Sequence, residues 1–245
     1  MAGKPSLSSR PTNRRSRSLP TTSAGLLSRT FAVLAKDVRL ELRSRYALST
    51  ILMFGVTTLT MVSFSLGQSG LGPKLLAALF WIIMFFSSMA GLAQVFIREE
   101  EAGTSLVLKL TADPAAVYLG KLAFNFLLLS ALTVIVTPLF FILTDAPTGT
   151  LLGFLAVLVL GVICLCGATT LVAAIIAKAA VKGTLFAVMC FPILVVPLFV
   201  LVSATAKALD GQPWGELSWE LQGLFAYAVV MVTASLMLFR FVWQE

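Results

Sequence analysis

The densest group of ionisable side chains outside the N-terminal region is a short polar stretch between two long apolar runs. Three consecutive glutamates precede Gly103 and Thr104, a leucine-rich segment follows, and Asp113 stands directly before Pro114. Negative charge near a helix start interacts favourably with the helix dipole, and Asp-Pro is typical of an N-cap and first helical position. The pattern predicts a short helix after Thr104 and a second helix from Pro114. Such a segment either transmits force from a partner or is a solvated loop.

The chain lacks the side chains on which most catalytic mechanisms depend. It contains no histidine, the commonest proton shuttle and metal ligand, and no Gly-x-Ser-x-Gly sequence. Residues 67 to 74 come closest to a phosphate-binding loop, but they lack its Gly-Lys-Ser/Thr ending. We therefore predict that the chain is not an enzyme and binds no cofactor or metal. Any energy must then come from ATP that a partner subunit hydrolyses.

Three cysteines, Cys164, Cys166 and Cys190, lie in apolar segments. Residues two apart on a helix point to nearly opposite faces, so Cys164 and Cys166 do not readily hold one ion. Small apolar packing is the expected role of all three thiols.

The composition places these motifs in a membrane protein. Hydrophobic residues make up 58% of the 245 positions, charged residues 12%, and the mean hydropathy is +0.97. About 20 apolar residues in a helix cross a hydrocarbon core. Six runs meet this requirement, near residues 47–66, 75–97, 122–144, 151–177, 183–203 and 221–240. The predicted fold class is an all-α polytopic membrane protein with six transmembrane helices.

The positions of Lys and Arg predict the orientation, because loops rich in these residues stay in the cytoplasm. With the N-terminus inside, sixteen of the eighteen basic residues fall on the inner side, and only Lys74 and Lys207 on the outer side. Both termini and the acidic segment are therefore predicted to be cytoplasmic. Attraction of juxtamembrane residues to membrane lipid explains the net charge of +7 better than nucleic acid binding does.

Two segments precede the first apolar run. Residues 1 to 23 are rich in Ser, Arg, Pro and Thr and have few large apolar side chains, which predicts a disordered basic cytoplasmic tail before a membrane domain over residues 24 to 245. Between residues 26 and 46 apolar side chains recur with helical spacing, while Lys36 and Arg39 lie on another face. This predicts an elbow helix in the headgroup plane, or a helix docked on a partner. The apolar face is predicted to contain Leu27, Phe31, Leu34, Val38 and Leu42.

Polar residues near the ends of two runs are candidates for a functional surface. Ser87, Gly91 and Gln94 share a face of the second run, and Lys121 and Asn125 share a face where the third begins. Because unsatisfied polar groups are costly in lipid, we expect these two faces to meet. Helix packing and a substrate path are both open as the reason.

The loop predicted between the last two runs, residues 204 to 220, contains Trp214 and Trp219 among acidic residues. Tryptophans at such a boundary are typical of an interfacial anchor, and an outer gate is the alternative. Pro192 and Pro197 interrupt the fifth run, which predicts either a moving element or a structural kink.

The acidic segment resembles a known family of membrane proteins. An acidic cluster, Gly-Thr, a leucine-rich short helix, a proline and a Gly-Lys entry into the next span resemble the coupling segment of type-2 ABC exporter permeases. More narrowly, eight residues follow the pattern of the CcmB family, a membrane component of the haem exporter used in cytochrome c maturation. They are Phe96, Glu100, Gly103, Leu110, Pro114, Lys121, Asn125 and Pro138. One departure is that Ser105-Leu106-Val107 stand where such permeases often have Leu-Glu-Gln.

The resemblance implies a homodimeric permease in the bacterial cytoplasmic (inner) membrane, bound to two copies of an ABC ATPase subunit. ATP would bind to that ATPase, and haem to a separate haem-handling membrane subunit that serves a periplasmic haem chaperone. Whether haem is moved by this chain or the loaded chaperone is released stays open. The alternatives are a type-2 ABC exporter for a lipid, drug or polysaccharide, and a non-transport scaffold. The residues expected to couple to the ATPase are Glu99, Glu100, Glu101, Gly103, Thr104, Leu106, Leu110 and Asp113.

Overall fold

A computed structural model describes residues 23–66, 71–92, 113–176 and 182–244, and all regular secondary structure in these ranges is helical. The helices are α1 (Ser23–Ser44), α2 (Tyr46–Leu66), α3 (Pro73–Leu92), α6 (Pro114–Thr144), α7 (Leu151–Ile176), α8 (Lys182–Leu209) and α9 (Trp214–Gln244). Apart from α1, each contains a stretch long and apolar enough to cross a membrane. The predicted polytopic all-α fold with six candidate spans is therefore confirmed. The predicted disordered tail, up to residue 22, lies outside the described ranges.

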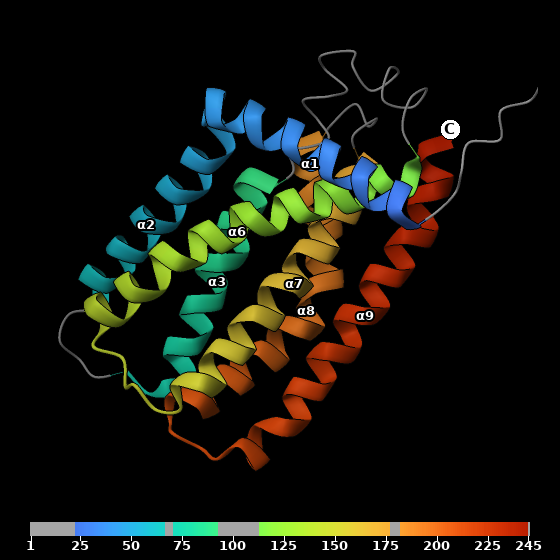
Figure 1. Ribbon diagram of the computed structural model, residues 1–245. Coiled ribbons are helices and arrows are strands. Elements are labelled where there is room, and N and C mark those ends of the chain that lie inside the picture. The colour runs from blue at the N-terminus through green and yellow to red at the C-terminus, as the bar shows by residue number, and fades with distance from the viewer. Residues whose placement is uncertain (1–22, 67–70, 93–112, 177–181, 245) are drawn as a thin grey trace, which may run out of the picture.

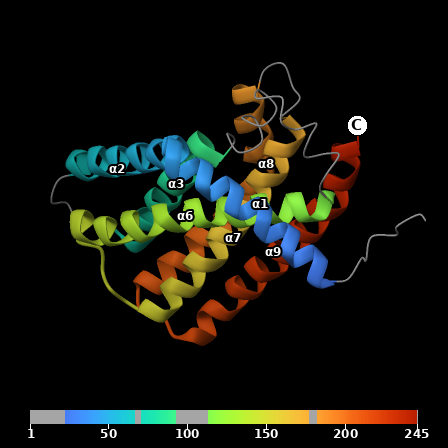
Figure 2. The same cartoon turned by 45° about the horizontal axis from the view of Figure 1, so that its top comes forward.

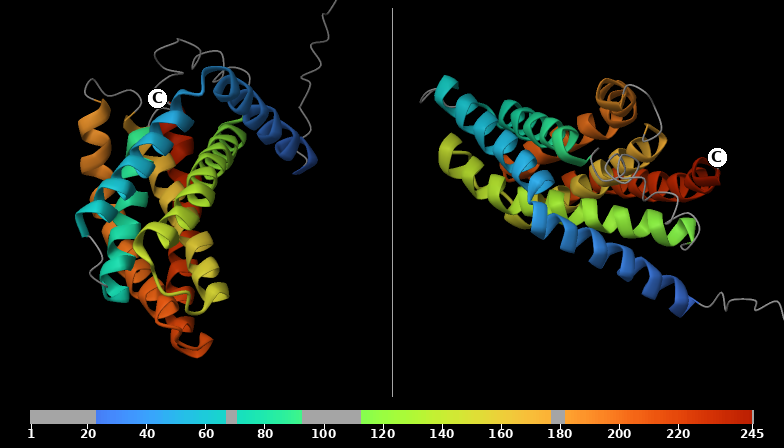
Figure 3. Two further views of the ribbon diagram at one scale, coloured as in Figure 1. Left: turned by 90° about the vertical axis from the view of Figure 1, so that its left-hand side faces the viewer. Right: turned by 90° about the horizontal axis from the view of Figure 1, so that it is seen from above.

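Six long helices form an oblique bundle, and α1 lies across one end of it (Figure 1). We call this the elbow end; it also contains the start of α6 and the end of α9. The opposite end, which we call the hairpin end, contains the short connections at residues 145–150 and 210–213. Helix α7 is central, because it packs against α6, α8 and α9. Helix α1 packs mainly along α6 and only slightly against α2, as two further directions of view show (Figures 2 and 3).

A close contact around Trp81 joins α3, α7 and α8. The indole ring is buried, and its Nε1 donates a hydrogen bond of 2.8 Å to Thr205 Oγ1 on α8. On α7, Gly161 lies so near the ring that a Cβ at this position would overlap it. Phe80 packs edge-on against Trp81, with 5.4 Å between the ring centroids. In a membrane, such close packing and interhelical hydrogen bonds hold helices together, because lipid provides little hydrophobic driving force between them.

At the hairpin end, the connection between α6 and α7 lies on the connection between α8 and α9. Thr150 donates from its backbone N–H to Ala208 O at 2.8 Å, and from its hydroxyl to Gln212 O at 2.9 Å. Beside this contact, Lys207 Nζ lies 2.7 Å from Glu220 Oε1 and joins α8 to α9. These bonds tie the two helical hairpins together at this end.

Several helices extend further than the apolar runs. Helix α6 begins at Pro114, as the Asp-Pro pattern predicted, whereas α8 continues to Leu209 and α9 begins already at Trp214. The predicted loop at 204 to 220 is therefore wrong, because only residues 210–213 connect the last two helices. Backbone hydrogen bonding continues past the hydrocarbon-soluble residues until turn chemistry ends it, here at Gly211, whose φ is +77°. The charged residues Lys207 and Glu216 thereby belong to helices and not to a loop.

Candidate functional site

The start of α6 is the described part of the predicted coupling segment. Asp113 has an extended backbone, its side chain accepts a hydrogen bond from Ala115 N at 3.0 Å, and Pro114 occupies the first helical position. The predicted N-cap is therefore confirmed. The other predicted coupling residues lie outside the described ranges, as does Gln94: they are Glu99, Glu100, Glu101, Gly103, Thr104, Leu106 and Leu110.

Two turns after this cap, a buried ion pair joins α6 to the elbow helix. Lys121 is 0% exposed, and its Nζ lies 3.5 Å from Oδ2 of Asp37 on α1, which is 7% exposed. Lys36 Nζ lies 3.2 Å from the other oxygen, Oδ1. A carboxylate withdrawn from water needs such partners, because an unpaired buried charge is very costly. The interface between α1 and α6 is thus held by charge as well as by apolar contact.

The face of α1 that packs against the bundle contains two acidic residues. Its centre is formed by Val33, Asp37 and Glu41. Glu41 Oε1 accepts a hydrogen bond of 2.8 Å from Leu48 N at the start of α2. The two acids have partners on neighbouring helices, while three residues of the predicted apolar face are exposed, as expected for a helix that lies in the headgroup plane. The exposed residues are Leu27, Phe31 and Leu42, whereas Leu34 and Val38 are partly buried against the core.

Asn125, one turn further along α6, is fully buried. Its Nδ2 donates to Thr170 Oγ1 on α7 at 2.9 Å, and its Oδ1 has no hydrogen-bond partner among the described residues. Ser87 donates instead to Ile83 O within α3, as hydroxyl side chains in helices often do. No hydrogen bond joins Ser87 to Asn125 among the described residues, and because Gln94 lies outside them, the meeting of the two polar faces stays a prediction. Helix α6 uses its polar groups to contact α1 and α7.

Helix α9 meets the same part of α6 through an aromatic contact. The rings of Tyr118 and Phe239 are 5.3 Å apart, and the Tyr118 hydroxyl lies near Ser235. Tyr118 and Phe239 are both buried. The first three turns of α6 therefore contact α1, α7 and α9 through named side chains.

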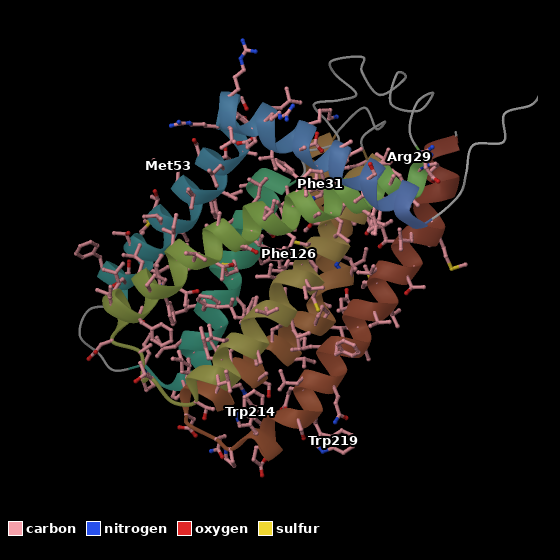
Figure 4. The ribbon with its side chains drawn as sticks, viewed as in Figure 1. Arg29, Phe31, Met53, Phe126, Trp214 and Trp219 are labelled. Atoms are coloured by element: carbon pink, nitrogen blue, oxygen red, sulfur yellow. The ribbon has the colours of Figure 1, made fainter. Side chains whose placement is uncertain are left out.

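Trp214 and Trp219 lie at the hairpin end, far from Arg29 and Phe31 at the elbow end (Figure 4). Trp219 is 80% exposed. Trp214 borders an open apolar groove of about 670 Å³ between α7 and α9. The structure does not bring them together with the polar residues of α6. Their roles as anchor or gate stay predictions.

Sequence reasoning missed Asp37 and Thr170. The signal for Asp37 was its spacing from Glu41, because residues four apart share one helix face, and both acids lie in an otherwise basic and apolar segment. Thr170 gave no such signal, since threonine is common in apolar helices. Both residues contact α6, so their importance depends on tertiary structure.

Six candidate spans and an elbow helix that packs on the start of α6 define a polytopic helical membrane protein. A family model for the CcmB protein matches residues 28–243. The chain therefore belongs to the CcmB family, and it is a multi-pass membrane component of a haem exporter for cytochrome c maturation. Within that multi-subunit exporter, proteins of this family are permease subunits. No curated protein matches the chain.

Proposed function

We propose that this subunit passes the ATP cycle of a separate ABC ATPase into the membrane through residues 98–113. The observation that carries this proposal is the junction at Asp113, where the acidic segment ends in a capped helix. The first turns of that helix contact α1, α7 and α9. A displacement of the segment is therefore transmitted to three neighbouring helices rather than absorbed in a loose loop.

The distribution of charge supports a cytoplasmic position for the elbow end. Arg39, Arg43 and Arg45 lie on or next to α1 and are exposed there, whereas the hairpin end has Lys74 and Lys207. Positively charged residues are retained on the cytoplasmic side of bacterial membranes. We therefore place both termini and residues 98–113 in the cytoplasm, with the chain in the inner membrane.

Haem is assigned to a partner subunit in this proposal. The chain has no histidine, the usual axial ligand of haem. A division of labour follows, in which the ATPase binds ATP, a haem-handling membrane subunit holds haem, and this subunit converts hydrolysis into haem export or release of a loaded periplasmic chaperone. We propose a homodimer of this chain as the membrane core.

The test neutralises the acidic cluster in the intact complex. The variant Glu99→Gln, Glu100→Gln, Glu101→Gln should lose the ATPase during purification in mild detergent, or retain it without stimulated ATP hydrolysis. The control removes three exposed acids at the hairpin end, through Asp145→Asn, Asp210→Asn and Glu216→Gln. This control should purify with full ATPase stimulation.

Identification of the co-purified subunits completes the test. A wild-type complex without any ATPase, or a cluster variant with undiminished stimulation, would show the proposal to be wrong. An ATPase without a haem-handling subunit or haem absorption band would favour export of another substrate.

A further inference from the structure

The buried ion pair of Asp37 and Lys121 is not required by the function proposed above. Burying a charged side chain away from water is costly. A pair of apolar residues of similar volume often stabilises a protein as well as, or better than, a buried ion pair. Stability alone therefore does not account for a fully buried lysine opposite a buried aspartate. The pair is explained if α1 and α6 must be held in one specific register.

The contact next to the pair shows that this register is tightly constrained. A Cβ added to Gly120 would lie 2.8 Å from Val33 Cβ and 3.1 Å from Thr30 O. These distances are too short for any side chain, so the backbone of α6 approaches α1 as closely as glycine permits. Lys121 follows directly and meets Asp37 one turn further along α1. Any sliding of α1 along α6 would separate the charges while both remained buried.

The elbow helix is less firmly joined to the helix that follows it in the chain. Arg45, between α1 and α2, has a left-handed backbone with φ of 53°, and the two helices make few contacts beyond the bond from Leu48 N to Glu41. Figure 3 shows α1 lying beside α6 and turning away from α2 at this joint. The contacts therefore couple α1 more strongly to α6 than to α2.

We propose that Asp37 and Lys121 are a positioning pair that locks the elbow helix to the start of α6, so that both helices move as one body. Lys121 lies eight residues after the Asp113 cap, about 12 Å along the helix axis. Motion that enters at Asp113 therefore displaces α1 together with α6. The exposed Leu27 and Phe31 on α1 carry this motion into the headgroup layer. The coupling role rests on the function proposed above, whereas the lock does not.

The first experiment compares charge variants in the complete complex in nanodiscs. Lys121→Met and Asp37→Asn should still purify with the ATPase, but stimulated hydrolysis should fall by at least about fivefold, the lower end of typical coupling effects between sites. The swapped variant Asp37→Lys, Lys121→Asp should restore it. Two controls should match the wild type: Arg39→Gln removes an exposed charge from α1, and Lys207→Met breaks the ion pair at the hairpin end.

The second experiment measures the lock itself with spin labels. Phe31 on α1, Phe126 on α6 and Met53 on α2 are exposed and are labelled in Figure 4. Labels at Phe31→Cys and Phe126→Cys should give one narrow distance distribution that does not change with ATP. The Phe31→Cys, Met53→Cys distance should change with ATP, because it spans the joint at Arg45. In Lys121→Met the Phe31–Phe126 distribution should broaden, in the isolated subunit as well as in the complex.

These outcomes separate the two proposals. A wild-type subunit that binds no ATPase refutes the coupling function, yet the label distances still test the lock. A Lys121→Met variant with a narrow Phe31–Phe126 distribution refutes the lock, and so does a wild-type distance that shifts with ATP. Wild-type stimulation in both single variants, or failure of an assembled swapped variant to recover it, overturns the coupling role of the pair.

Discussion

The contact between Gly161 and Trp81 predicts that two destabilising substitutions compensate each other. In Gly161→Ala, the added methyl group overlaps three atoms of the outer six-membered ring of Trp81. Overpacking of this kind costs about 1–3 kcal/mol, while the better helix propensity of Ala returns about 1 kcal/mol. Relative to the wild type, a net loss of about 0–2 kcal/mol is expected, and relative to a glycine-to-alanine change without overlap, about 1–3 kcal/mol.

Trp81→Phe removes that outer ring and the indole N–H. The hydrogen bond to Thr205 is lost, which costs about 1 kcal/mol, and the vacated space adds a cavity term of similar size, about 1 kcal/mol. In the double variant, the Ala methyl group occupies part of this space. The double variant should therefore lose less stability than the sum of the two single losses, by about 1–2 kcal/mol, within the range found for residues in contact.

The native cysteines can report the free energy of unfolding of these variants. Cys164, Cys166 and Cys190 are free and buried, so a thiol-reactive dye labels them when the helices separate. Labelling in detergent across a denaturant series gives the free energies of unfolding for the four members of the cycle. Gly223→Ala is the matched control, since nothing lies within 4 Å of a Cβ added there. Losses that add to within about 0.5 kcal/mol would refute the packing argument, as would a Gly161→Ala variant as stable as the control.

Three further predictions concern other contacts. In the same dye assay, a double-mutant cycle of Asn125→Leu and Thr170→Val should give a coupling of about 0.6–1.7 kcal/mol for their 2.9 Å bond, and zero coupling contradicts the bond. Glu220→Gln should cost about 0.2–1 kcal/mol, because Lys207 is 34% exposed. This cost should shrink as salt is raised, so a salt-independent loss argues against an ion pair. Trp219→Ala should change stability by less than about 0.5 kcal/mol while reducing fluorescence quenching by brominated lipid; undiminished quenching excludes an interfacial anchor.

The sequence predicted well those features that depend on neighbouring residues. Each apolar run became a helix, because its length and lack of interior charge suffice for a span. The cap at Asp113 was predictable because an N-cap needs only its own side chain and the next backbone N–H groups. The same local reasoning failed at residues 204 to 220, where helix ends depend on Gly211 rather than on hydropathy.

The buried polar contacts were not predictable, because they join distant parts of the chain. In a membrane, apolar side chains face lipid and protein interior alike, so periodicity does not reveal which face of a helix is buried. On α1 the apolar residues Leu27 and Phe31 are exposed, while Asp37 is buried. Only the position of α6 explains this choice.

The separation of Asp37 and Lys121 along the chain has a consequence for biosynthesis. Lys121 is made 84 residues after Asp37, the difference between their positions. Until then the elbow helix has neither Lys121 nor the close contact with Gly120, although α2 and α3 have already been made. Helix α6 then arrives with a buried lysine whose carboxylate is already in place. The contact between α1 and α6 can therefore form only after α2, α3 and the start of α6 have been made.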